Sequence, residues 1–243
     1  MGTPTPQDQK YVLGIECSNP SVRGSNRGEV GLAKIVDGGG LGFVGSVGLS
    51  GEARGSDGLM SAVDALCGEH GVSAGDIGRV VVSVGPGGYT ALRVSVTVAK
   101  VLGEVIGCGV VAVPTAAVGG VAIKRDASGI DAVVALASKK GKAHCTRVVD
   151  GEMRVLGVIG GEGLVEVGAE VLVGDEFVPE GMVEAARAAG MEIRGIELTA
   201  RGCLEASVGI GEIEPERLGV LYAREPDAVS QWRALGRGLG KGK

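Results

Sequence analysis

Short apolar runs alternate with helix-like periodicity along the first half of the chain. A compact β-branched run bounded by polar turns predicts a buried strand, and such runs cover 11–15, 30–36, 42–49, 79–84 and 110–113. Between Gly55 and His70 apolar residues recur every three or four positions, which predicts a helix with one buried face. A second helix is expected over 89–107. This order predicts a mixed sheet with helices on its faces.

The apolar pattern breaks at Lys124–Gly129, and a second series of elements follows. Strands are predicted at 132–137, 143–149, 154–159 and 170–173, and helices at 180–190 and 199–208, the latter capped by Thr199. We therefore predict an α/β protein of two lobes. Their expected limits are 11–125 and 126–235, between a disordered tail at 1–10 and a flexible tail at 236–243.

The predicted helix over 89–107 is apolar around most of its circumference. At about 100° per residue, a narrow polar stripe contains Arg93, Thr97, Lys100 and Glu104. One apolar side contains Leu92, Val96, Ala99 and Ile106, and the other contains Val94, Val98, Val101 and Val105. A surface helix buries only one stripe, so this helix needs a cover on two sides. The second cover is either the helix around Leu59–Leu66 or another protein.

A glycine-rich turn precedes this helix, in the segment Val84-Gly85-Pro86-Gly87-Gly88-Tyr89-Thr90. Backbone N–H groups at a glycine turn before a helix can hold an anion. On that interpretation Gly85, Gly87, Gly88 and Thr90 form the anion site. The alternative is that the glycines only permit a sharp turn and close packing, with Thr90 as the helix cap.

Composition narrows the functional classes. Glycine accounts for 46 of 243 residues and aromatic residues for 2%, so the core must consist of Val, Ala, Leu and Ile. Because each glycine loses much backbone freedom on folding, we expect a modestly stable fold that relies on a partner. A net charge of −5 argues against direct binding of a nucleic-acid backbone, which calls for a basic face.

The cysteines and the apolar segments indicate a cytoplasmic protein with no membrane association. Five widely spaced cysteines without a CxxC pair are typical of reduced thiols. The apolar region 94–122 is interrupted by Lys100, Glu104 and Pro114, so it never reaches the ~20 residues of a membrane span. The polar first ten residues differ from a signal peptide.

The segment from Gly85 to Arg93 resembles the Gly-Pro-Gly-Ser-Phe-Thr-Gly-Leu-Arg signature of the TsaB family, also called YeaZ. Similar pieces recur at Glu16-Cys17-Ser18, at Val113-Pro114-Thr115 and from Leu221 to Val229. The family belongs to the actin-like (ASKHA, ribonuclease H-like) superfamily, historically labelled glycoprotease-like or peptidase M22. The resemblance implies two actin-like lobes, each a mixed sheet flanked by helices.

The resemblance also implies a non-catalytic scaffold that pairs with the catalytic subunit TsaD, or with itself. That complex, with the ATPase TsaE, makes threonylcarbamoyladenosine beside the anticodon of tRNA. ATP and magnesium would bind through the partner subunits, without a tightly bound cofactor here, and tRNA would be contacted only indirectly. The expected partner interface consists of Leu59, Val63, Leu66, Leu92, Arg93, Val96, Ala99, Lys100 and Gly103.

Few residues suit catalysis. Glu16-Cys17-Ser18 follows the first strand, where actin-fold phosphotransferases place an aspartate and a glycine, and magnesium sites need carboxylates. The His-x-x-x-His metal pair of the catalytic relative does not occur in the helix after Gly88. His70 and His144 fall in different lobes and predict no metal site, and no Gly-x-Ser-x-Gly elbow precedes a helix.

Two alternatives stay open. One is an ATP-binding, small-molecule kinase-like enzyme of the same fold. The other is a homodimeric interaction protein that no longer takes part in tRNA modification. The second lobe departs from the family at Lys139–Lys142, where relatives carry Asp-Ala-Arg. This basic turn is either a solvated loop or a site whose role has changed.

Overall fold

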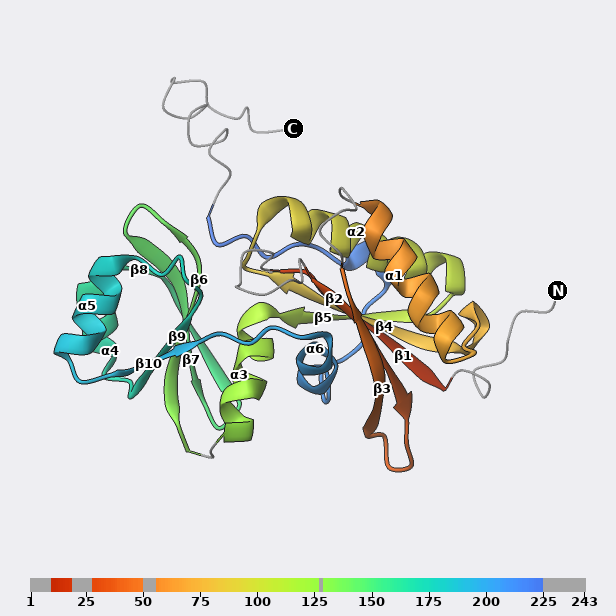
Figure 1. Ribbon diagram of the computed structural model, residues 1–243, viewed down its shortest axis with the longest axis horizontal. Helices are drawn as coiled ribbons and strands as arrows, with labels where there is room; N and C mark the ends of the chain where they lie inside the picture. Colours follow the sequence, from red (N-terminus) through yellow and green to blue (C-terminus); the bar gives the residue numbers. More distant parts are fainter. Residues whose placement is uncertain (1–9, 19–27, 50–55, 127–128, 225–243) are drawn as a thin grey trace, which may run out of the picture.

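The computed structural model describes residues 10–18, 28–49, 56–126 and 129–224. These residues form two five-stranded mixed sheets with helices on their faces (Figure 1). The first half contains β1 Tyr11–Glu16, β2 Glu29–Ile35, β3 Leu41–Gly48, α1 Ser56–Glu69, η1 Ala74–Asp76, β4 Ile77–Gly85, α2 Tyr89–Ile106, β5 Gly109–Pro114 and α3 Thr115–Asp126. The second half contains β6 Asp131–Lys139, β7 Lys142–Val149, β8 Glu152–Ile159, α4 Gly161–Val167, β9 Val171–Gly174, α5 Glu180–Ala188, β10 Glu192–Gly195, α6 Ala200–Ala206 and η2 Pro215–Arg217.

The two sheets have the same topology. The first has the order β3-β2-β1-β4-β5 and the second the order β8-β7-β6-β9-β10. In each, the first strand pairs antiparallel with the second and parallel with the fourth. The chain therefore repeats one βββαβαβ-like arrangement of strands, which no sequence repeat had indicated.

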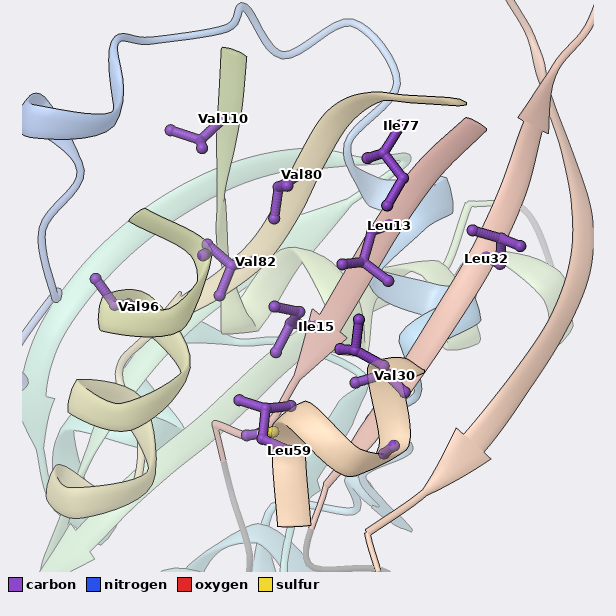
Figure 2. Close-up of a cluster of buried hydrophobic side chains, with 14 of the residues drawn as sticks. Leu13, Ile15, Val30, Leu32, Leu59, Ile77, Val80, Val82, Val96 and Val110 are labelled. Carbon is purple, nitrogen blue, oxygen red and sulfur yellow. The ribbon is translucent and has the colours of Figure 1, made fainter. Parts of the chain in front are cut away.

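Helices α1 and α2 cover one face of the first sheet. Leu59 from α1 and Val96 from α2 point toward the apolar side chains of the central strands (Figure 2). The strand residues alternate as a pleated sheet requires, so Leu13 and Ile15 face these two helices. Val12 faces the opposite side of the sheet, where α3 and α6 pack.

Helix α3 lies between the two sheets (Figure 1). Val118 contributes to the core of the first sheet, and Ala116 and Ile123 contribute to the core of the second. Gly119 and Gly120 allow α3 to pack closely against the second sheet. A Cβ on Gly119 would lie 3.1 Å from the Ile196 side chain, and one on Gly120 would lie 3.1 Å from the Val148 side chain. The remaining face of the second sheet is covered by α4 and α5, through Leu164 and Met182.

The last described part of the chain returns to the first sheet. Gly14 and Gly31 leave room for α6, because a Cβ at these positions would lie 2.7 Å from Leu204 or 2.8 Å from Ala200. Farther along, Val110 and Ile213 exchange backbone hydrogen bonds, and Leu221 N–H donates to Val84. This corrects the expectation that the helix near 199–208 packs in the second lobe.

The strand and helix order predicted from the sequence is confirmed at all thirteen predicted elements. Thr199 caps α6 as expected, since its hydroxyl accepts from Gly202 N–H at 3.0 Å. Helices α3 and α4 and strand β10 were not predicted from the sequence. Helix α3 lacked a one-sided apolar pattern because it is buried against both sheets, whereas α4 and β10 have seven and four residues. Within the described ranges, no helix has the length and apolar character to span a membrane.

Candidate functional site

The outward side of α2 carries the apolar surface that needs explanation. Val101 and Val105 are 53% and 79% exposed. Val94 and Val98 on the same side are half-buried, because they pack against the core that α1 and the first sheet share. All four lie on one of the two apolar sides predicted for this helix. We call these residues the α2 valine face. The polar stripe next to it exposes Arg93, Thr97 and Glu104.

The opposite apolar side of α2 is enclosed by the chain's own core, which corrects the predicted interface. Leu92, Val96 and Ala99 are buried, and Val96 and Ala99 pack on the first sheet (Figure 2). The predicted interface residues that are buried in this way are Leu59, Val63, Leu66, Leu92, Val96, Ala99 and Gly103. In the single chain these side chains therefore leave almost no surface for a partner.

Two polar residues of the predicted interface are held by neighbouring parts of the chain. Lys100 Nζ donates to the Glu216 carbonyl at 2.9 Å, so it fixes η2 against α2. Arg93 Nη1 donates to the Tyr89 hydroxyl at 3.0 Å and lies 5.3 Å from the centre of that ring. Tyr89 in turn stacks on Tyr222 at 5.4 Å. Arg93 is nevertheless exposed and remains available at the edge of the valine face.

The glycine turn before α2 is packed tightly against other backbone segments. A Cβ on Gly87 would lie 1.9 Å from the Ser18 carbonyl oxygen, and one on Gly85 would lie 2.4 Å from that of Leu221. Gly88 N–H donates to the Ser18 carbonyl at 2.7 Å, so this donor is already used. The geometry thus accounts for the glycines by close approach. The helix N-cap is Gly88, and Thr90 lies in the first turn rather than at the cap.

A buried carboxylic acid lies at the end of β1 beside this turn. Glu16 is 2% exposed, and its Oε1 accepts from the Ser18 N–H at 2.7 Å and the Ser18 hydroxyl at 2.6 Å. Burial raises the pKa of Glu16, although the bonds from Ser18 oppose the shift. Among the described residues Glu16 Oε2, Ser83 Oγ and Thr115 Oγ1 make no hydrogen bond of ordinary geometry, although Ser83 is close enough to Glu16 to oppose the rise in its pKa. Polar atoms therefore gather near the carboxyl ends of β1, β4 and β5.

The described residues include no group of three or more His, Cys, Asp and Glu side chains arranged to hold a metal. His70 follows α1 and lies against β3, where a Cβ on Gly45 would be 2.7 Å from its Nε2. His144 lies on β7 in the other sheet. The two histidines therefore belong to different lobes, as the sequence predicted. All five cysteines are free thiols.

Two lobes of matching topology, joined by α3 and with polar groups at the ends of parallel strands, define the actin-like (ASKHA) class of proteins. The comparisons agree with this class. Residues 53–196 match the family model described as TsaD: tRNA N6-adenosine threonylcarbamoyltransferase. Because this match spans more than half of the chain, the protein belongs to that family.

Two solved structures from Pseudomonas aeruginosa share the fold. An uncharacterized protein with similarity to peptidase YEAZ superposes with a TM-score of 0.66 at 19% identity, over 88% of this chain and 100% of its own. YeaZ superposes with a TM-score of 0.63 at 19% identity, over 88% and 99% of the two chains. No curated protein sequence matches the chain. The resemblance inferred from the Gly85–Arg93 segment, and the predicted pair of actin-like lobes, are confirmed.

Proposed function

We propose that this protein is a non-catalytic scaffold that pairs with a TsaD-like catalytic subunit through the α2 valine face. The observation that carries the proposal is the exposure of Val101 and Val105 on a long, otherwise well-packed helix. Exposed apolar surface of this kind marks an interaction site. Membership of the threonylcarbamoyltransferase family supports tRNA modification as the process served. The complex would act in the cytoplasm, with a TsaE-like ATPase as a further component.

The environment of Glu16 supports a non-catalytic role. A magnesium-binding carboxylate must be ionised and directed toward the metal, whereas the pKa of Glu16 is raised by burial. Its Oε1 is also used by the adjacent Ser18. In addition, Gly88 N–H and the space beside Gly87 are occupied by backbone of the same chain. On this proposal, ATP and magnesium are supplied by partner subunits.

The proposal is tested by placing one charge on either side of the exposed surface of α2. Val105→Glu introduces a carboxylate into the valine face, and Thr97→Glu introduces the same charge on the adjacent polar stripe. Because both positions are exposed, both variants should fold with melting temperatures near that of the wild type. Val105→Glu should lose co-elution with a TsaD-like subunit, because pairing would bury an unpaired charge, and Thr97→Glu should retain it.

Retention of the complex by Val105→Glu would contradict the proposed contact. A second copy of this chain can also be accommodated by an exposed apolar face, so light scattering of the isolated protein should accompany the experiment. Dimers that are lost in Val105→Glu, together with no TsaD-like complex, would favour the homodimer. Tight ATP–magnesium binding with turnover by the isolated chain would favour the kinase-like enzyme.

A further inference from the structure

A cationic hollow lies at one end of the second sheet, on the turn between β6 and β7. It has a volume of about 300 Å³ and is lined by Lys139, Lys140, Lys142, Val158 and Arg224. Among the described residues that line it, Lys139, Lys140, Lys142 and Arg224 are cationic, and none is acidic. This concentration of positive charge contrasts with the net charge of −5 for the whole chain.

Arg224 is fixed in this hollow by backbone carbonyls rather than by a carboxylate. Its Nη1 donates to the Ala137 carbonyl and its Nη2 to those of Lys139 and Lys142, each at 3.2 Å. These bonds satisfy donors but leave the positive charge uncompensated. No acidic side chain within the described ranges pairs with Arg224, Lys140 or Lys142.

The backbone of the turn is also constrained. Ala137 and Lys140 adopt positive φ values of 51° and 53°, which are uncommon for residues with a side chain. Arg224 contacts both ends of this turn and so joins the last described segment to the second sheet. For Lys140 this conformation follows from the two-residue turn that it forms with Gly141 (φ 73°) between the paired residues Lys139 and Lys142.

His144, next to the hollow, contributes a buried ring nitrogen that makes no hydrogen bond to the described residues. It lies directly opposite Val158 in the β7–β8 ladder, and its buried Nδ1 has no partner among the described residues. Burial lowers the pKa of His144, and the charge of Arg224 lowers it further. The cationic character of the site at neutral pH therefore comes from the lysines and Arg224.

We propose that this hollow binds the phosphate backbone of an RNA, and that it places part of the tRNA against the second lobe of the scaffold. Lysine and arginine side chains neutralise the phosphates of a bound nucleic acid, and this contribution to affinity does not depend on sequence. A free nucleotide would need a surface for its base and ribose, but Val158 is the only apolar residue among the described residues that line the hollow. The choice of tRNA rests on the proposed function. It replaces the expectation of purely indirect contact with RNA.

The experiment compares two double variants of the isolated full chain, each of which removes two positive charges. Lys140→Gln/Lys142→Gln changes the hollow, and Lys34→Gln/Lys124→Gln changes exposed lysines on β2 and α3. Binding of fluorescently labelled tRNA is followed by anisotropy between about 50 and 200 mM salt, a range over which phosphate contacts lose orders of magnitude in affinity. All four lysines are exposed, so thermal melting should show unchanged folding.

The hollow variant should bind tRNA about a hundredfold more weakly at the lowest salt concentration, since each of the two lost contacts involves a charged donor and contributes about a factor of ten or more. The slope of log K for tRNA binding against log salt concentration should become smaller in magnitude by about one for each lysine removed. The control variant should show the wild-type affinity and slope. Equal weakening of both variants, or no tRNA binding by the wild type, would overturn the proposal. ATP binding that is lost in the hollow variant while tRNA binding persists would overturn it in favour of a nucleotide.

The outcome is separable from that of the scaffold proposal, because RNA binding is measured without a partner subunit. Loss of tRNA binding with pairing intact in Lys140→Gln/Lys142→Gln would support the hollow alone. Loss of pairing with tRNA binding intact in Val105→Glu would support the valine face alone.

Discussion

Two valines on α2 should respond in opposite ways to the same truncation. Val96 is 6% exposed and packs between α2 and the first sheet (Figure 2), whereas Val105, nine residues along the same helix and so on its opposite side, is 79% exposed. Val96→Ala removes two buried methyl groups, which contribute about 1.6 kcal/mol of transfer free energy at ~0.8 kcal/mol each. The cavity that remains brings the expected loss of unfolding free energy to about 2–3 kcal/mol. Val105→Ala removes almost no buried surface, and alanine favours the helix by about 0.5 kcal/mol.

Urea unfolding followed by circular dichroism measures this difference. Val96→Ala should lower the transition midpoint without changing the slope m, and it should lower the melting temperature by about 4–12 °C at ~2–4 °C per kcal/mol. Val105→Ala should leave both values unchanged or slightly raise them, yet weaken pairing with a TsaD-like subunit. Comparable destabilisation by both variants would show that Val105 belongs to the folded core, and would refute the assignment of the two sides of α2.

Three further predictions concern the junction at β1, the glycines and the thiols. Burial raises the folded-state pKa of Glu16 above its unfolded value, so its contribution to stability is fully present below about pH 4.5 and is lost as pH rises through the folded pKa. The unfolding free energy of Glu16→Gln relative to wild type should therefore increase from pH 5 to pH 8, and a pH-independent difference would contradict this. Gly87→Ala should cost more than about 3 kcal/mol, because its Cβ would lie 1.9 Å from a backbone oxygen. Gly181→Ala, in open space on α5, should instead stabilise by about 0.5–1 kcal/mol, and equal melting temperatures would argue against this contrast. Iodoacetamide should modify the half-buried Cys67 first in native protein, since Cys17 is buried and its pKa is raised to about 12. Mass spectrometry that finds Cys17 modified first would contradict the burial order.

Local patterns were sufficient for much of the secondary structure and for the fold class. The compact apolar run of β1 and the 3.6-residue period of α1 and α2 depend only on residues close in sequence, so those elements could be predicted. Helix α3 could not, because a helix buried on both sides shows no contrast between its faces. The glycines of β1 and β2 also lacked a local explanation, since the reason for their small size is α6, which comes about 170 residues later.

The candidate sites also combine features that the sequence predicts with features that only tertiary packing decides. The sequence by itself determined that α2 has two apolar sides separated by a polar stripe, because helical periodicity depends only on residue spacing. It could not determine which side faces the sheet, since that depends on how Gly85–Gly88 packs against Ser18 and Leu221 and on where η2 lies. Likewise, the sequence showed three lysines in a turn, but only the tertiary structure brought Arg224 to them. The face of a helix or strand on which a residue lies depends only on nearby sequence. Which distant residues come to lie beside that face depends on the packing of the whole chain.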